Sequence, residues 1–314
     1  MFGVRGNRVK RHGRMRTLVQ CACAALTNGY AAGFARGKVS SGASKGLCVP
    51  VLNCSSCPGA LGSCPIGALQ AAGGSPRHTI AFYVLGTLAL FGVVFGRLVC
   101  GFACPFGLTQ DLLARIPAPK LNVPAALDRV LRKVKYLILA FLVLGIPAIS
   151  IATGDSVAPF FCKLFCPAGT LEAGIPLVAL NTGLRDDAGL LFGWKVLVLV
   201  VILLLCVFVR RPFCKWFCPL GAFYSLFNKF SFYRMDFEAH ACVGCKKCVH
   251  ACPMGIDVRD DPNNPECIRC GSCKASCPSH AIMSGWKARV SQVEKNVARL
   301  SESANAVKDR VEES

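Results

Sequence analysis

The sequence predicts a mainly α protein: a four-span transmembrane domain with a two-fold internal repeat, then a small cysteine-rich domain and a C-terminal helix. Three observations support this fold class. The 314 residues are 53% hydrophobic and only 17% charged, which is typical of a membrane protein. Four apolar stretches precede a dense run of cysteines. Short Cys-Pro motifs recur near the ends of these stretches, so that the two halves of the membrane domain resemble each other.

Charged residues at the ends of the apolar stretches predict the topology. Residues 1–16 hold six Arg or Lys and no acid, and residues 115–135 are also basic. Because cytoplasmic loops carry the excess of Lys and Arg, we expect these segments and both termini in the cytoplasm. The transmembrane domain is expected over residues 17–235. Its four expected spans are residues 17–34, 79–99, 136–153 and 190–209. A cleaved signal peptide is the alternative interpretation of the first span.

The formal charge of +19 does not point to nucleic acid, because the basic residues flank apolar segments and form no aromatic-interleaved patch. The expected partner of this charge is the lipid bilayer. None of the five histidines lies in the middle of an apolar span, so haem held between two helices is not expected. The 21 cysteines are therefore expected to carry redox chemistry, whereas Cys21, Cys23 and Cys206 in apolar segments are expected to pack.

Residues 236–284 contain the most specific pattern in the chain. Cys242-x2-Cys245-x2-Cys248-x3-Cys252-Pro is followed by Cys267-x2-Cys270-x2-Cys273-x3-Cys277-Pro. In this doubled run the fourth cysteine of each copy binds the other cluster, which predicts a bacterial-type ferredoxin domain with two 4Fe-4S clusters. The expected ligands of the first cluster are Cys242, Cys245, Cys248 and Cys277. Those of the second are Cys267, Cys270, Cys273 and Cys252. Paired zinc ribbons are the alternative, although they usually have a longer spacer. Reduced thiolates place this domain in the cytoplasm.

The Cys-Pro motifs of the membrane domain form an internal duplication. Cys64-Pro-Ile-Gly and Cys100-x3-Cys104-Pro-Phe-Gly flank one helix, and Cys162-x3-Cys166-Pro-Ala-Gly and Cys214-x3-Cys218-Pro-Leu-Gly flank another. Two copies with the same direction through the bilayer bring like ends together. One or two further iron-sulfur clusters are therefore expected.

At the inner face the expected ligands are Cys100, Cys104, Cys214 and Cys218. At the outer face they are Cys57, Cys64, Cys162 and Cys166, with Cys54 as the substitute. Disulfides are the alternative outside, and structural thiols or zinc are the alternatives inside. Asp111 and Glu172 are the only acids close to these motifs, and each is equally well interpreted as a solvated residue.

Through the CxxxCP motifs at 100–105 and 214–219 and the double ferredoxin run, the chain resembles the membrane polyferredoxins. That family includes the ferredoxin-bearing membrane subunit of periplasmic nitrate reductase systems and the C-terminal half of the membrane protein that supports nitrous-oxide reductase. The resemblance covers residues 78–285. It implies a multi-pass protein of a bacterial-type inner membrane that moves electrons between the quinone pool or cytoplasmic carriers and a periplasmic reductase.

The chain departs from these relatives in its extra outer motifs at 54–67 and 162–169 and in lacking the flavin-binding periplasmic domain of some members. The redox partner is therefore not carried over from the resemblance.

The expected function is a membrane-bound iron-sulfur electron conductor with redox protein partners on the cytoplasmic side and at the periplasmic face. No catalytic residue is expected. The outer and inner motifs lie one helix length apart, about 30 Å, which is far for one electron-transfer step. Re-entrant loops or a bound quinone would shorten that distance. The alternatives are a quinol dehydrogenase subunit and a redox sensor or assembly factor for a metalloenzyme.

Residues 285–314 are predicted to form a C-terminal amphipathic helix. Its apolar seam consists of Val290, Val293, Val297, Leu300, Ala304, Val307 and Val311. The alternating steps of three and four residues are those of a coiled coil, which predicts self-association. The alternative is a helix that lies on its own ferredoxin domain.

Overall fold

The computed structural model describes residues 2–39, 42–72, 79–121, 123–153, 158–186 and 189–286. Over these ranges the chain is mainly helical with one two-stranded sheet, which confirms the predicted fold class at this level. The predicted coiled-coil seam begins at Val290 and lies outside the described residues.

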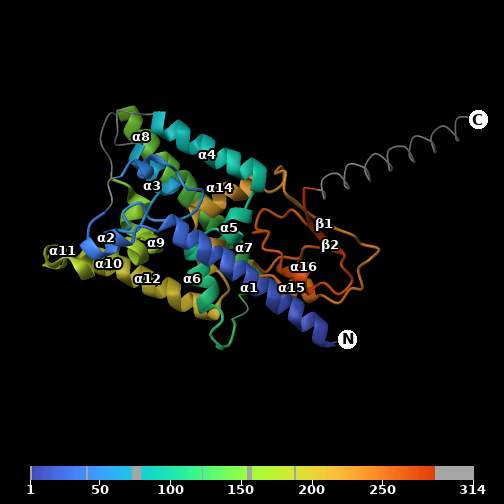
Figure 1. The fold of residues 1–314 in the computed structure, drawn as a ribbon. Helices are drawn as coiled ribbons and strands as arrows, with labels where there is room; N and C mark the ends of the chain where they lie inside the picture. The colour runs from blue at the N-terminus through green and yellow to red at the C-terminus, as the bar shows by residue number, and fades with distance from the viewer. Residues whose placement is uncertain are drawn as a thin grey trace, which may run out of the picture.

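The N-terminal helix is longer than the expected first span and starts earlier. Helix α1 (Phe2–Thr27) is continuous through the basic segment and the apolar segment that follows it. It ends at Thr27 because Asn28 and Gly29 are poor helix formers, and the chain resumes as α2 (Ala31–Arg36). Figure 1 shows α1 extending from the helical bundle to the ferredoxin domain, where it packs against α16.

The long helices of the bundle follow the predicted apolar stretches with shifted ends. Helix α4 (Thr79–Phe95) stops at Gly96, whose φ of +59° is left-handed, and α5 (Leu98–Phe102) follows. Helices α7 (Ala125–Leu137), η2 (Ile138–Gly145) and α8 (Ile146–Thr153) form one continuous rod, so this rod starts before the expected residue 136. The π-helical turns of η2 precede Pro147, which cannot donate a backbone hydrogen bond to the preceding turn. Helix α12 (Leu190–Phe208) agrees with the expected fourth span.

Two helical segments in the described part are long and apolar enough to cross a membrane by length and composition, Ala125–Thr153 and Leu190–Phe208. Phe82–Phe95 and Pro167–Leu180 are shorter apolar helices.

One end of the bundle collects the segments predicted to lie outside. These are η1 (Ala43–Gly46), α3 (Pro65–Ala72), η3 (Phe161–Phe165), α9 (Pro167–Gly169), η4 (Thr170–Gly174), α10 (Ile175–Leu180) and α11 (Thr182–Asp186). Figure 1 shows α2, α3, α8, α10 and α11 at the end opposite to the N-terminus and the ferredoxin domain. The outer helix α3 nevertheless contacts α14 (Pro219–Phe227), which follows an inner motif. The outer loops therefore fold inward.

The Cys-Pro motifs start short helices. Cys104 precedes α6 (Pro105–Leu113), and Cys218 follows α13 (Pro212–Trp216) and precedes α14. Proline is favoured as the first helical residue, because its missing N–H would have no partner there in any case. The thiol of Cys218 caps α14 by accepting the N–H of Gly221 at 3.3 Å. Cys166 caps α9 in the same way, through Gly169 at 3.3 Å.

The ferredoxin domain is itself a duplication. Strand β1 (Arg234–Phe237) pairs antiparallel with β2 (Ile282–Gly285), and α15 (Lys247–Ala251) packs on α16 (Ser272–Ser276). Gly244 and Arg269 occupy the same position in the two CxxC turns, and both have a left-handed backbone. Arg269 tolerates this conformation because its buried guanidinium is fixed by the bundle, with a hydrogen bond to Ser231 at 2.6 Å.

Candidate metal centres

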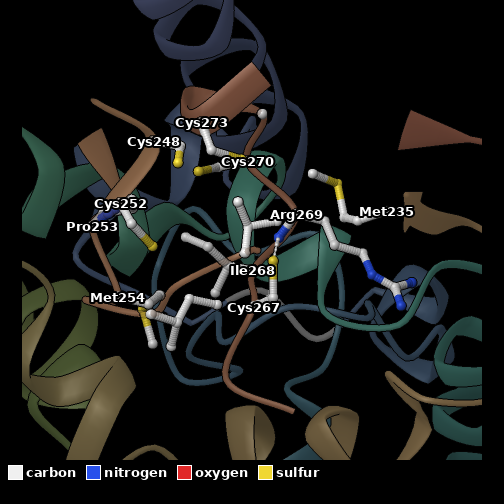
Figure 2. Close-up of a pocket in the computed structure, with 13 residues that line it drawn as sticks. Met235, Cys248, Cys252, Pro253, Met254, Cys267, Ile268, Arg269, Cys270 and Cys273 are labelled. Atoms are coloured by element: carbon white, nitrogen blue, oxygen red, sulfur yellow. Dashed lines mark hydrogen bonds between the residues drawn. The ribbon is translucent and has the colours of Figure 1, made fainter. Parts of the chain in front are cut away.

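The four cysteines predicted for the second ferredoxin cluster lie together. Cys252, Cys267, Cys270 and Cys273 line one pocket with Cys248, and Figure 2 shows the side chains that surround it. Burial and the neighbouring Cys270 and Cys252 together raise the pKa of Cys267 to about 12, so the thiols are close enough to oppose each other's ionisation. The backbone N–H of Arg269 donates to the Cys267 sulfur at 3.4 Å. These four cysteine sulfurs are suitable ligands for an iron-sulfur cluster.

The cysteines predicted for the first ferredoxin cluster are less enclosed. Cys248 and Cys277 belong to one apolar cluster with Met235, whereas Cys245 is exposed and Cys242 is half-buried. Burial raises the pKa of Cys248. The structure thus brings Cys248 and Cys277 into one apolar environment and places Cys245 at the surface.

The four inner cysteines of the membrane domain converge, although they come from two widely separated motifs. Cys100, Cys104, Cys214 and Cys218 are all 5–7% exposed. Burial raises the pKa of both Cys104 and Cys218, and Cys214 and Cys100 raise it further in each case. Such mutual opposition requires all four sulfurs to share one region. A buried set of four thiolates needs compensating positive charge, which a bound iron-sulfur cluster would supply.

Two buried arginines lie beside the inner cysteines, and the cysteine motifs alone did not predict either of them. Arg97 and Arg211 each lie three residues before the first cysteine of a CxxxCP pair, and both are fully buried. Each crosses to the other motif: Arg97 Nη2 donates to the Cys214 carbonyl at 3.2 Å, and Arg211 Nη1 donates to the Cys100 carbonyl at 2.9 Å. The repeated Arg-x-x-Cys-x-x-x-Cys-Pro pattern was the available signal.

Both arginines are held by buried carboxylates. Arg211 Nη2 pairs with Asp111 at 2.6 Å, and Arg97 Nη1 pairs with Glu266 at 2.9 Å. Asp111 also binds Arg16 of α1, so it is a bridge between elements and not the solvated residue that the sequence allowed. Although burial by itself would raise the pKa of Asp111, the guanidinium groups of Arg211 and Arg16 hold it below its usual value.

The inner site touches the ferredoxin domain. Gly101 lies between the paired inner cysteines, and an added Cβ there would lie 2.5 Å from the carbonyl oxygen of Ile268. Ile268 separates Cys267 from Cys270 in the second ferredoxin group. Cys100 and Cys270 belong to the same buried cluster, so the two candidate centres share one core. Glu266 adds ionic contacts to Arg97 and Lys135 across this junction.

At the outer end the structure gathers Cys54, Cys64, Cys162 and Cys166. Burial raises the pKa of Cys166, and Cys162, Cys64 and Cys54 add to the effect. A Cβ on Gly169 would lie 3.6 Å from the sulfurs of both Cys166 and Cys54. The position that corresponds to Cys100 is Ala60, so a fourth thiol at this site has to come from elsewhere in the loop, where Cys54 and Cys57 are available.

Cys57, the expected outer ligand, packs against Ala60 and Ala173, and Cys54 packs against the same cluster. The substitute Cys54 is placed by Glu172, whose carboxylate accepts the Cys54 backbone N–H at 2.7 Å. Burial raises the pKa of Glu172 to about 7 despite this hydrogen bond. Glu172 is therefore a buried positioning group for the loop and not a solvated acid.

None of the 21 cysteines, all within the described ranges, forms a disulfide. Among the described residues, no three His, Cys, Asp or Glu side chains are gathered as ligands of one metal ion. In a 4Fe-4S cluster each thiolate binds a different iron atom, so the ligand sulfurs stand further apart than around a single ion.

Tyr224 lies between the inner and outer sites. It is fully buried, and its hydroxyl donates to the Pro50 carbonyl of the outer loop at 3.0 Å. Besides burial, the thiols of Cys100, Cys48, Cys104 and Cys64 raise its pKa, so inner and outer cysteines both lie near this ring.

Two family comparisons match most of the chain. Residues 77–124, 136–175 and 191–235 match a family described as a 4Fe-4S binding domain. Residues 228–296 match a 4Fe-4S dicluster domain, which agrees with the two predicted ferredoxin clusters. No solved structure matches the chain.

Curated relatives include an uncharacterized protein of Methanocaldococcus jannaschii, 31% identical over 67% of this chain and 79% of its own length. The Escherichia coli protein YccM, named for electron transport, is 25% identical over 64% of this chain and 54% of its own. The ferredoxin-type protein MauN of Paracoccus denitrificans, named for methylamine utilization, is 32% identical over 51% of this chain and 50% of its own. The chain thus spans about half the length of YccM and of MauN.

Proposed function

The chain belongs to the membrane polyferredoxin family of iron-sulfur electron-transport proteins, and from this premise we propose that it conducts electrons between a cytoplasmic carrier and a partner at the outer membrane face. The contact between Gly101 and Ile268 carries the proposal. It joins the second ferredoxin group to the inner cysteines within one buried cluster, so the two centres are adjacent.

We propose further iron-sulfur clusters at two membrane-domain sites. The inner ligands are Cys100, Cys104, Cys214 and Cys218, and the outer ligands are Cys54, Cys64, Cys162 and Cys166. A bound 4Fe-4S cluster supplies one-electron transfer at a potential between roughly −700 and +450 mV. The protein holds the ligands, excludes water and places buried arginines beside the inner set.

The proposed topology keeps the ferredoxin domain and the N-terminus in the cytoplasm. The two long apolar segments, together with α1 and α4, would provide four spans. The basic residues at the ferredoxin end of the bundle support this orientation, because positive charge favours the cytoplasmic face. The domain limits expected from the sequence are kept in this proposal, with the membrane domain over 17–235 and the ferredoxin domain over 236–284.

The test is iron and acid-labile sulfide per chain in anaerobically purified protein, together with EPR of the dithionite-reduced sample. About sixteen irons are expected if four 4Fe-4S clusters are present, and about eight would restrict the clusters to the ferredoxin domain.

The double variant Cys162→Ser, Cys166→Ser should lose about four irons and transmembrane electron transfer while it keeps the ferredoxin signals. Cys206→Ser is the matched control, because this buried cysteine belongs to neither set. Transfer that persists in the double variant would remove the outer site from the conduction path.

A second function, quinol oxidation, is favoured by a cavity of about 390 Å³ beside the second ferredoxin group. Its lining includes Cys252, the apolar Leu121 and Phe208, and the titratable Asp128 and His250. Quinol oxidation releases two electrons and two protons, and a quinol in this cavity would lie beside Cys252, a proposed ligand of the second ferredoxin cluster.

This alternative predicts reduction of the clusters by a soluble quinol in the purified protein. Leu121→Trp, which would narrow the cavity, should weaken that reduction without changing reduction by dithionite. If quinol does not reduce the wild-type protein, the cavity is not a quinol site.

A further inference from the structure

We propose that Gln70 and Gln110 are matched positioning residues, each of which donates an amide N–H to one cluster thiolate and so raises the reduction potential at its site. The inference rests on the proposed function, because it requires clusters at the inner and outer cysteines. It assigns a role to two glutamines that lie outside the cysteine motifs themselves.

The two glutamines occupy equivalent positions relative to the Cys-Pro motifs that precede them. Gln70 lies six residues after Cys64, and Gln110 lies six residues after Cys104. Both lie in helices that start with the proline of a Cys-Pro motif, α3 and α6. Both side chains are buried, with 2% and 0% exposure. Buried polar groups cost stability unless they are hydrogen-bonded, so their presence at equivalent sites calls for specific partners.

Each glutamine crosses from the first half of the repeat to a cysteine of the second half. Gln110 Nε2 lies 3.1 Å from the Cys214 sulfur, and Gln70 Nε2 lies 3.3 Å from the Cys162 sulfur. In both cases the acceptor is the first cysteine of a CxxxCP pair. The same contact therefore occurs twice, at sites whose other surroundings differ.

The orientation of each amide follows from its surroundings. Gln70 Oε1 accepts the backbone N–H of Phe161 at 2.9 Å, which leaves Nε2 to face the sulfur. Gln110 Oε1 is buried without a hydrogen-bond partner in the described part of the chain. Turning that oxygen toward Cys214 would place two electron-rich atoms together, so donation from Nε2 is the favourable arrangement.

The electrostatic consequence has a definite sign. Reduction adds one electron to a cluster, breaks no covalent bond and increases the negative charge on the sulfurs. An N–H donor therefore stabilises the reduced form more than the oxidised form, and hydrogen bonds to the sulfurs are among the factors that set cluster potentials. Removing the donor should lower the potential at that site.

The experiment is a potentiometric titration of full-length, anaerobically purified protein monitored by EPR. Gln110→Met keeps the volume of the side chain and removes the donor. The equilibrium constant for reduction of the inner cluster should fall about tenfold, which is 59 mV for one electron, while the ferredoxin potentials stay constant. Gln70→Met should shift only the outer cluster.

Each of the two variants is the matched control for the other, because Gln70→Met removes a buried amide of the same kind at the outer site. Gln70→Met should leave the inner potential unchanged. An unchanged potential in Gln110→Met would overturn the inference.

A second measurement does not depend on the variants folding. Pulsed EPR of reduced wild-type protein with 15N-labelled glutamine side chains should show a nitrogen coupling to the inner cluster, and its absence would also reject the role of Gln110. The two proposals fail separately: about eight irons per wild-type chain would refute the membrane-domain clusters, whereas twelve or more irons with no coupling would refute the glutamine role alone.

Discussion

Gly101→Ala tests whether the inner site and the ferredoxin domain depend on close backbone contact. The new Cβ would lie 2.5 Å from the Ile268 carbonyl oxygen, whereas an ordinary contact begins at 3.4 Å. The ferredoxin loop must therefore withdraw by about 0.9 Å, or α5 must move away from it. Either shift would separate the two candidate centres.

The magnitude follows from two opposing effects. Overpacking of this kind costs about 1–3 kcal/mol, whereas replacing a helical glycine by alanine gains about 1 kcal/mol. The net change in the free energy of unfolding should be a loss of about 0–2 kcal/mol. Gly86→Ala in α4 is the matched control. Its Cβ would meet nothing within 4 Å, so this variant should show only the gain in stability from replacing a helical glycine. The two variants should thus differ by about 1–3 kcal/mol.

Two measurements check this prediction. Thermal unfolding compares the stabilities of the two variants, and EPR of the reduced protein compares the magnetic coupling between the second ferredoxin cluster and the inner cluster. Gly101→Ala should be less stable than Gly86→Ala and should show weaker coupling. Equal stability and equal coupling in the two variants would refute the proposed contact as the connection between the centres.

Three further predictions concern the surroundings of the sites. Asp111→Asn removes the carboxylate shared by the buried Arg211 and the half-buried Arg16, and thermal unfolding at pH 7 should show a cost of about 3 kcal/mol, the low end for breaking a buried ion pair. Because the pKa of Asp111 is lowered in the folded protein, its contribution to the free energy of unfolding is complete above the usual carboxyl pKa of about 3.9. This contribution should stay constant between about pH 5 and 8 and fall only in stronger acid. Tyr224→Phe should cost about 0.5–1.5 kcal/mol, because the half-buried Pro50 carbonyl loses its donor, while a result near zero in thermal unfolding would mean that water replaces the hydroxyl. Cys54→Ser should lose the outer-site iron whereas Cys57→Ser should keep it, and the reverse iron contents would restore the ligand set expected from the motif.

The ferredoxin cysteines could be assigned from the sequence because their ligand spacing is local. Each CxxC closes within one turn, so a short pattern contains most of the geometry. The inner set required a further step, since Cys100 and Cys214 come together only through the internal duplication. The structure brings all four inner cysteines into one region, as the duplication predicts, and their role as cluster ligands stays a prediction.

The outer site could not be derived in the same way. Its first repeat has Ala60 where the inner motif has a cysteine, so the replacement ligand depends on how a loop folds. Glu172, a residue more than one hundred positions away, accepts the Cys54 N–H, and the proposed choice of Cys54 over Cys57 rests on this contact. Such a tertiary contact leaves no short-range pattern. Arg97 and Arg211, in contrast, recur at the same position before each inner motif, although no role was predicted for them.

The distance between the two faces is the point at which the structure changes the functional argument. With the outer motifs at the far end of a straight helix, the centres would be separated by about 30 Å, too far for one rapid step. The described loop instead folds into the core, where Cys64 belongs to the same buried cluster as Cys100, Cys104 and Tyr224. Tyr224 starts from an inner-site helix and hydrogen-bonds the outer loop, so a single side chain spans the region between the two sites. The loop therefore brings the outer cysteines closer to the inner site than a straight helix would, which supports the proposed conduction between the two faces.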